Sequence, residues 1–145
     1  MKSLNNGIFE FLLDLKSNNN REWFNENKAK FIEHQNTIKT FALDIEKSLN
    51  NSDQIEKVKV FRIYRDVRFS KDKSPFKTNF GIAFLRKKPY LHGGYYIHIT
   101  PGGCFIASGI WDPSNNDLLR IRKEIEFNGD EMNKVVCHNN IKNYW

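Results

Sequence analysis

The sequence predicts an α+β fold, in which N-terminal helices pack on a mainly antiparallel sheet of three to five strands and a further helix follows. Two observations favour this class. Apolar residues recur with helical spacing through about the first fifty residues, and from Val58 onward β-branched and aromatic segments alternate with turns. With no internal repeat and no flexible linker, residues 1–145 are expected to form a single domain.

The N-terminal part predicts two helices. The first is short and carries the apolar residues between Ile8 and Leu15, and the polar run 17–20 ends it. Asn20 is the predicted N-cap of one long second helix, which ends at the polar residues 50–52. Its apolar stripe repeats every seventh residue, at Phe24, Phe31, Ile38 and Ile45. We therefore expect Trp23 and Phe24 to lie in the core.

The strands are predicted from their composition. They span Val58 to Val67, Phe80 to Leu85, Tyr95 to Thr100 and Cys104 to Trp111, and the last two flank a Pro101-Gly102-Gly103 turn. A third helix is expected to begin near Asp112-Pro113 or Ser114 and to stop at Asn128-Gly129. The tail from Asp130 to Trp145 is expected to be weakly helical at best.

Several classes of protein are disfavoured. Glu10 and Asp14 interrupt the apolar N-terminal stretch, and no run approaches the roughly 18 apolar residues of a membrane span, so we expect a cytoplasmic protein without membrane contact. Cys104 and Cys137 lie far apart and are interpreted as ordinary thiols. Neither the cysteines nor the histidines have metal-ligand spacing, and no cofactor-binding fingerprint occurs, so no metal or cofactor is indicated.

The net charge of the chain resides in one segment. Residues 57–77 hold eight Lys or Arg and two Asp, whereas the other 124 residues hold 15 basic and 15 acidic side chains. A neutral chain with one basic segment indicates a particular surface that attracts anions. The sequence does not identify the anion.

The central motif resembles a known family. It reads FRIYRDVRFSKDKSPFKTN from Phe61 to Asn79, and the segments NNREWF from Asn19, GYYIHI from Gly94 and GIWDP from Gly109 follow in the family's order. The chain resembles the family catalogued as domain of unknown function 2461. Two departures matter: Phe76 stands where the family has a tyrosine, and family members continue beyond Trp145, so we expect a domain truncated at its C-terminus. The resemblance implies no reaction, cofactor or ligand.

The motif supplies the candidate anion site. A strand from Val60 to Asp66 would place Arg62, Tyr64 and Asp66 on one face, and the segment from Arg68 to Pro75 is typical of a loop. Arginine grips phosphate or carboxylate with paired hydrogen bonds, and lysine adds a point charge. The predicted anion ligands are Arg62, Arg65, Arg68, Lys73 and Lys77, with Tyr64, Ser70 and Tyr96 in support. Three other lysines are interpreted as solvated: Lys57, Lys59 and Lys71.

A second candidate lies at the start of the long helix. Free backbone N–H groups there favour an anion, and Arg21 and Lys28 would add charge. Plain capping is the alternative, and the roles of Asn19 and Asn27 are left open.

Three functions remain possible from sequence. The first is a module that binds phosphate or nucleic acid, with aromatic residues stacking on bases. The second is an enzyme for a phosphorylated or carboxylated small molecule, in which Asp66, Asp72 or His98 transfers protons. The third is a structural or interaction module whose charges pair internally. The two Ser-x-x-Lys patterns, at Ser70 and Ser74, lack the accompanying elements of a serine nucleophile site. Oligomeric state is left open.

Overall fold

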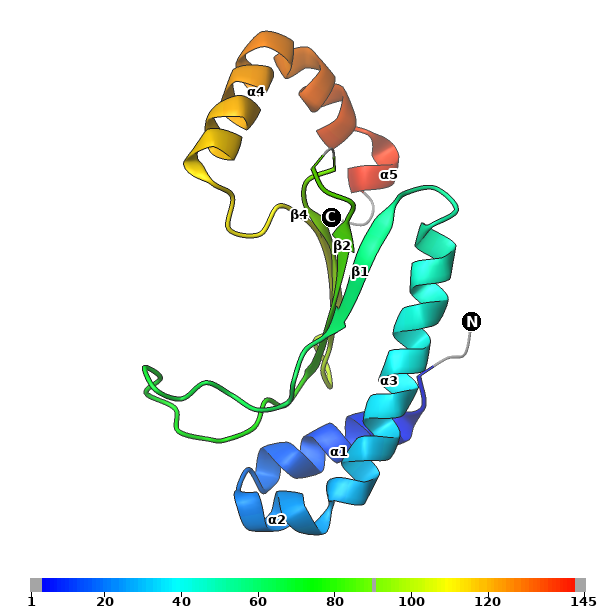
Figure 1. Cartoon of the computed structure of the whole chain (residues 1–145), viewed down its shortest axis with the longest axis vertical. Coiled ribbons are helices and arrows are strands. Elements are labelled where there is room, and N and C mark those ends of the chain that lie inside the picture. The colour runs from blue at the N-terminus through cyan, green and yellow to red at the C-terminus, as the bar shows by residue number, and fades with distance from the viewer. Residues whose placement is uncertain (1–3, 90, 143–145) are drawn as a thin grey trace. The chain divides into compact units, whose positions relative to one another are not determined.

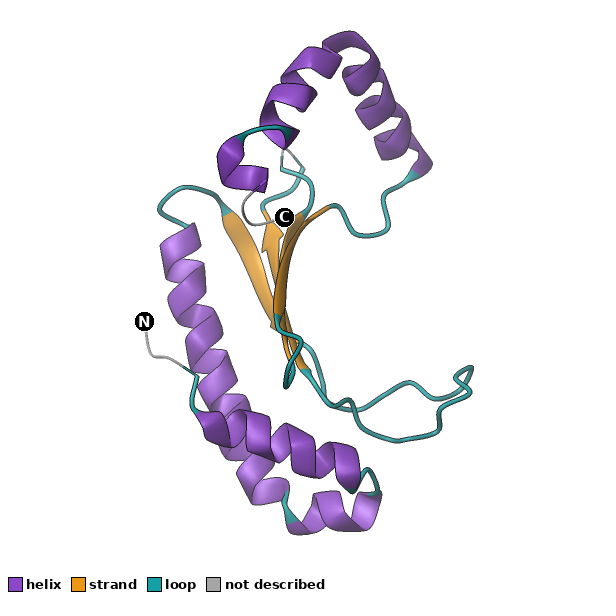
Figure 2. Ribbon diagram, turned by 180° about the vertical axis from the view of Figure 1, so that it is seen from behind, coloured by secondary structure: helices purple, strands orange, loops and turns teal. Residues whose placement is uncertain are grey.

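The computed structural model describes residues 4–89 and 91–142. They form two compact units that divide between Gly109 and Ile110, and each is described by itself. The first unit holds three helices, α1 (Asn6–Ser17), α2 (Arg21–Glu26) and α3 (Lys28–Leu49), and four strands, β1 (Ile55–Val60), β2 (Phe80–Arg86), β3 (Gly94–Ile99) and β4 (Phe105–Gly109) (Figures 1 and 2). The second unit holds α4 (Asn115–Val136) and α5 (Asn139–Lys142). The predicted α+β class is confirmed.

The predicted single long helix is wrong, because the chain breaks into α2 and α3 at Asn27. The Asn27 side chain donates to the carbonyl oxygen of Trp23 at 3.0 Å, and its backbone leaves the helical region at φ −100° and ψ 11°. Asparagine side chains compete with helical hydrogen bonds in this way. The predicted cap at Asn20 is confirmed, since its side chain accepts from the Trp23 N–H at 2.9 Å.

The strands form one antiparallel sheet in the order β1-β2-β3-β4. The hairpin between the last two strands is confirmed, and its turn contains Gly102 with a φ of +71°. The predicted first strand is wrong at both ends. It begins at Ile55 and stops at Val60, and residues 61–79 form a long loop that Figure 2 shows as an excursion from the strands.

The core lies between the helices and one face of the sheet. In the part of the chain that the structure describes, fourteen buried apolar side chains form a single cluster, to which α1 contributes Ile8, Phe11, Leu12 and Leu15, and β2 contributes Phe80, Ile82 and Phe84. Phe24 is buried there as predicted, whereas Trp23, which was also expected in the core, is half-buried and packs against the cluster. Because side chains alternate along a strand, Gly81, Ala83 and Leu85 of β2 point to the opposite face.

That opposite face is called the open face. Figure 1 shows α1 and α3 on the other side of the sheet, and among the described residues of the first unit no helix covers the open face. The strand register places on it Lys57 and Lys59 with the adjoining Phe61, then Gly81, Ala83 and Leu85, then Tyr96 and His98, and lastly Phe105 and Ala107.

The second unit is more helical than predicted. Ser114 caps α4 as expected, accepting from the Asp117 N–H at 3.2 Å. The predicted stop at Asn128-Gly129 is only a kink, where Asn128 has φ −123° and ψ 36°, and α4 continues to Val136. The expectation of a weakly helical tail is therefore wrong for residues 130–142, while residues 143–145 lie outside the described ranges. Among the helices of the described ranges, none combines the length and apolar character needed to cross a bilayer.

Candidate anion-binding site

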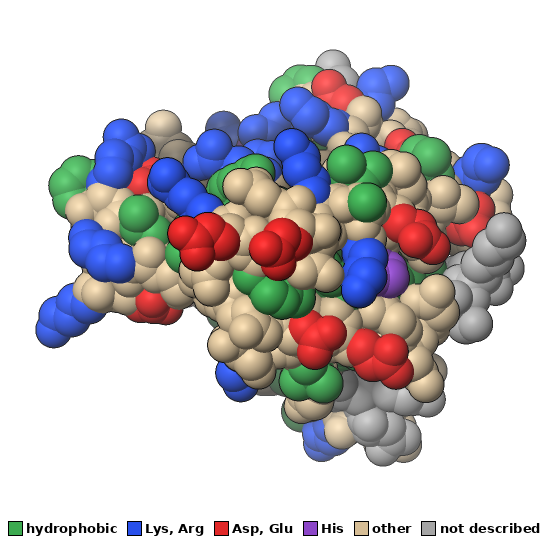
Figure 3. All heavy atoms as spheres, turned by 90° about the horizontal axis from the view of Figure 1, so that it is seen from below, with side chains coloured by type: hydrophobic (Ala, Val, Ile, Leu, Met, Phe, Trp, Pro, Cys, Tyr) green, Lys and Arg blue, Asp and Glu red, His purple; other side chains and the backbone are tan. Residues whose placement is uncertain are grey.

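Residues 61–79, here called the basic loop, leave the sheet after β1 and return at β2. Figure 1 shows the loop projecting away from the strands, and Lys and Arg side chains gather where it projects (left in Figure 3). Two backbone hydrogen bonds close its base: Arg65 N–H to Pro75 O at 2.9 Å, and Lys77 N–H to Ile63 O at 2.7 Å. The loop is therefore an ordered structure with a paired base.

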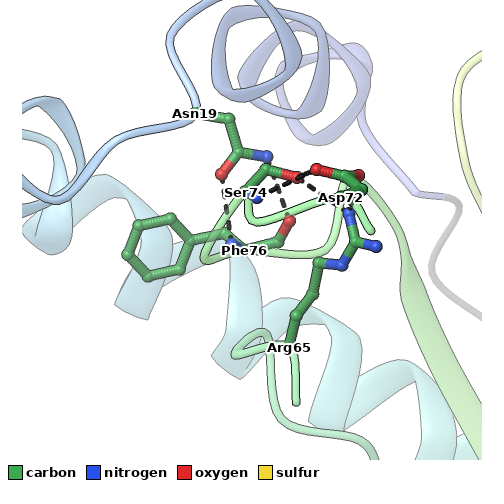
Figure 4. Close-up of polar contacts among 5 residues, drawn as sticks. All are labelled: Asn19, Arg65, Asp72, Ser74 and Phe76. Carbon is green, nitrogen blue, oxygen red and sulfur yellow. Dashed lines mark hydrogen bonds and ion pairs between the residues drawn. The ribbon is translucent and has the colours of Figure 1, made fainter. Parts of the chain in front are cut away.

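Asn19 fastens this base to the turn between α1 and α2. Its amide donates to the Phe76 carbonyl oxygen at 3.0 Å and accepts from the Phe76 N–H at 3.1 Å (Figure 4). The Phe76 ring is 2% exposed and stacks on Phe24, with ring centroids 4.0 Å apart. Tyr64 packs edge-on against Phe24 at 6.0 Å. Phe76 and Tyr64 thus serve packing, and Asn19 receives the role that the sequence left open.

Arg65, Asp72 and Ser74 form a closed network inside the loop (Figure 4). Arg65 pairs with the Asp72 carboxylate and donates to Ser74 Oγ at 2.8 Å. The Ser74 hydroxyl and N–H both donate to Asp72 Oδ1, at 2.6 Å and 2.9 Å. The Ser74 hydroxyl, followed by its N–H and the Arg65 guanidinium, lowers the pKa of Asp72 to about 2. Asp72 is therefore ionised at neutral pH and balances the charge of Arg65.

Arg68 and Lys73 are also engaged inside the loop. The Arg68 guanidinium donates twice to the Asp66 carboxylate, at 3.0 Å and 2.7 Å, and this hydrogen bonding lowers the pKa of Asp66 and raises that of Arg68. Lys73 Nζ donates to the Val67 carbonyl oxygen at 3.0 Å. Three predicted anion ligands, Arg65, Arg68 and Lys73, thus have internal partners, although the Arg68 side chain is 76% exposed.

Of the remaining two predicted cations of the motif, Lys77 lies beside the open face, and Arg62 is within electrostatic range of both Lys77 and Asp66. Lys77 Nζ lies 5.6 Å and Lys59 Nζ 4.9 Å from the centroid of the Phe61 ring. Burial, and then the positive charges of Arg62 and Lys59, lower the pKa of Lys77. Lys59, Arg62 and Lys77 are here called the cationic cluster. None of the ion pairs within residues 4–89 and 91–142 includes a member of it.

Aromatic side chains extend from this cluster across the open face. The rings of Phe61 and Tyr96 are 6.1 Å apart, and Phe105 follows 5.9 Å from Tyr96. Gly81 makes this row possible, since a Cβ there would lie 2.6 Å from the Tyr96 hydroxyl oxygen. Sequence reasoning did not single out Phe61 and Phe105, and its interpretation of Lys59 as solvated agrees with the exposed side chain. Lys59 and Phe61 could have been placed on one face from the sequence, because Lys57, Lys59 and Phe61 occupy alternate positions along β1 and the residue that follows it.

His98 belongs to the same face. Its ring stacks on Phe105 with centroids 4.7 Å apart, and its Nδ1 lies 3.2 Å from the Tyr96 hydroxyl. Burial lowers the pKa of His98 and raises that of Tyr96, so His98 is neutral at pH 7. In the described ranges, no contact joins His98 to Asp66 or Asp72.

The other predicted positions do not join the cluster. Arg21 is exposed at the start of α2, which has only six residues, and the Asn20 side chain already accepts from an N–H of that turn. Ser70 is half-buried within the basic loop. Within residues 4–89 and 91–142, no three His, Cys, Asp or Glu side chains gather to hold a metal ion.

A shallow hollow lies at the turn between α3 and β1, lined by residues 50–54, Arg86 and Leu91. Asp53 there pairs with Arg86 at 2.8 Å and accepts from the Tyr95 hydroxyl at 2.7 Å. The Tyr95 hydrogen bond is the main cause of a lowered Asp53 pKa. These contacts link the turn to β2 and β3, so we assign them a structural role.

The fold and the side chains together define an α+β protein. Helices cover one face of its sheet, and on the other face aromatic side chains lie beside a cationic cluster. The chain belongs to the family described as conserved hypothetical protein (DUF2461), which it matches over residues 7–145. The family expected from the central motif is therefore confirmed. Comparisons with curated proteins and with solved structures gave no match.

Proposed function

We propose that this protein binds phosphate-bearing ligands through the cationic cluster of Lys59, Arg62 and Lys77. The observation that carries the proposal is two lysines over the Phe61 ring, with Arg62 close enough to Lys77 to lower its pKa, and with no member of this cluster in an ion pair of the described residues. Burial is the first cause of the lowered pKa of Lys77, and repulsion by the positive charges of Arg62 and Lys59 adds to it. A bound phosphate would relieve the repulsion.

The proposal separates the charges of segment 57–77 into two groups. Arg65 and Arg68 have carboxylate partners, and Lys73 donates to a carbonyl oxygen, so these residues support a structural role in the basic loop. Lys59 and Lys77 have no carboxylate partner among the described residues, and Arg62 acts on Asp66 only through its charge, without an ion pair, so positive charge is left for an external ligand. This division favours binding over the purely structural alternative, in which every charge would pair internally.

Catalysis on a small molecule has less support. Proton transfer needs an acid or base within hydrogen-bond reach of a held substrate. Asp66 and Asp72 are committed to arginine partners in the basic loop, whereas His98 lies on the sheet and bonds to Tyr96. The hollow at the α3–β1 turn is lined by none of these side chains.

Binding of inorganic polyphosphate by charge variants tests the proposal. A charge-assisted contact contributes roughly 1.5 to 3 kcal/mol, so we expect Lys77→Gln to lower the affinity about tenfold or more. Lys71→Gln is the matched control, because it removes the same charge from an exposed side chain of the same loop. We expect it to change the affinity less than twofold. Calorimetric titration measures both, with thermal unfolding to check the fold.

Equal losses in Lys77→Gln and Lys71→Gln would show that only net charge attracts the polyanion. Arg68→Gln gives a second comparison. Because Arg68→Gln alone would leave the Asp66 carboxylate unpaired within electrostatic range of Arg62, it is combined with Asp66→Asn, and this double substitution, which leaves the net charge unchanged, is expected to leave polyphosphate affinity nearly unchanged.

A further inference from the structure

We infer that the phosphate-bearing ligand is a single-stranded nucleic acid whose unpaired bases stack on the open face. The inference rests on the proposed function, because the cationic cluster would supply the contacts to the backbone phosphates. It adds a site for the bases, formed by Phe61, Tyr96 and Phe105.

The three aromatic side chains of the open face, here called the aromatic row, are the surface on which the bases would stack. Phe61, Tyr96 and Phe105 follow one another across the sheet at 6.1 Å and 5.9 Å between ring centroids. Phe105 is 51% exposed, and the other two rings are half-buried. The rings are inclined to one another, by 69° between Phe61 and Tyr96 and by 49° between Tyr96 and Phe105, and Phe105 stacks on His98 on one side. Each ring can therefore offer its exposed part to a separate unpaired base, since every base has an aromatic face.

The open face carries positive charge at one end and no negative charge at the positions that the strand register places on it. The register places no acidic residue on it between Lys57 and Phe61, between Gly81 and Leu85, or at Tyr96, His98, Phe105 and Ala107. Two lysine ammonium groups lie over the Phe61 end of the row. A strand whose phosphates contact the cationic cluster would therefore continue onto uncharged rings without meeting a carboxylate.

Unpaired bases distinguish a single-stranded nucleic acid from other polyanions. In a duplex the faces of the bases are already stacked on each other, so they cannot use exposed rings. An acidic peptide would use the cations but has no flat group for every ring. A small phosphorylated molecule favours a concave pocket, whereas the cluster and the row lie on a sheet surface that no helix covers among the described residues of the first unit.

The test compares three probes by fluorescence anisotropy with the full chain. They are a 12-nucleotide thymidine DNA strand, an abasic strand with the same backbone, and poly-glutamate of similar charge. We expect the thymidine strand to bind roughly tenfold more tightly than the abasic strand, because stacked bases add to the phosphate contacts.

Two ring variants give the decisive comparison. Phe105→Ala is expected to weaken binding of the thymidine strand roughly tenfold and to leave the abasic strand unchanged. Phe69→Ala is the matched control, since that ring is 96% exposed in the basic loop and lies outside the row. We expect it to leave both affinities unchanged. Thermal unfolding checks that each variant folds, and Tyr96→Ala serves as a second variant of the row.

The outcomes separate the two proposals. Equal affinity for the thymidine and abasic strands, or no effect of Phe105→Ala and Tyr96→Ala on the thymidine strand, would overturn base stacking and leave phosphate binding intact. Poly-glutamate binding as tight as the thymidine strand would also overturn it. Failure of every probe to bind, with polyphosphate equally inert, would overturn the proposed function itself.

Discussion

The carboxylate of Asp72 is hydrogen-bonded and paired entirely to partners inside the basic loop. Its carboxylate accepts from the Ser74 hydroxyl, the Ser74 N–H and the Arg65 guanidinium. Asp66 does the same for Arg68, through both the guanidinium and the backbone N–H, the latter at 3.3 Å. These carboxylates were candidate proton carriers in the sequence, and their contacts favour a role in shaping the loop.

The Asp72 network predicts a specific pH dependence. Because folding lowers the pKa of this carboxyl from 3.8 to about 2, the network stabilises the loop fully above about pH 4. That stabilisation is lost as the pH falls toward 2, when the carboxylate becomes protonated. The amide signal of Ser74, followed by NMR, should titrate with a midpoint near 2. Asp72→Asn should remove this transition, and a midpoint at the ordinary value would contradict the network.

At the scale of elements, asparagine side chains decide where helices begin, break and meet the loop. Asn20 caps α2, Asn27 separates α2 from α3, and Asn19 holds the basic loop against the helices. The cap was predictable because N-cap preferences are local. The other two roles were not, since Asn27 breaks an otherwise regular apolar stripe and Asn19 contacts a residue 57 positions away.

Asn19→Ala tests this link between helices and loop. The substitution leaves the Phe76 N–H and carbonyl without their side-chain partner, and a part-buried polar group without a partner costs about 1–3 kcal/mol. We expect the free energy of unfolding, measured by urea denaturation, to fall by about that amount. Asn25→Ala changes an exposed asparagine of α2 and is expected to have an effect within about 0.5 kcal/mol. Similar values for both variants would contradict a role for Asn19.

The strand predicted from Val58 to Val67 failed for a physical reason at the same scale. Its composition favours a strand, but a strand needs a partner. After Val60 the pairing is reduced to one hydrogen bond from the Phe61 N–H to the Gly81 carbonyl oxygen and an isolated bridge between Tyr64 and Phe76. Pro75 has no N–H to donate, and the side chains of Asp66 and Asp72 accept backbone N–H groups of the loop. Composition reports none of these pairings.

For the whole molecule, the sequence predicted a basic segment but not which of its charges have partners inside the protein. Arg62 and Lys77 were predicted ligands and lie in the cationic cluster, whereas Arg65, Arg68 and Lys73 have internal partners. Lys59 was assigned to solvent, because a lysine on a strand more often faces water. Which cations pair depends on how the loop folds, and neither spacing nor net charge reveals it.

The most direct test of the cationic cluster is an NMR titration of the uniformly labelled chain with inorganic polyphosphate. If the cationic cluster binds phosphate groups, the largest shift changes are expected to occur at Lys59, Phe61, Arg62 and Lys77 and to extend to Tyr96 on the open face. Largest changes instead at the loop residues Arg68 to Lys73, or at the basic residues Arg120, Arg122 and Lys123 of α4, would contradict phosphate binding at the cluster.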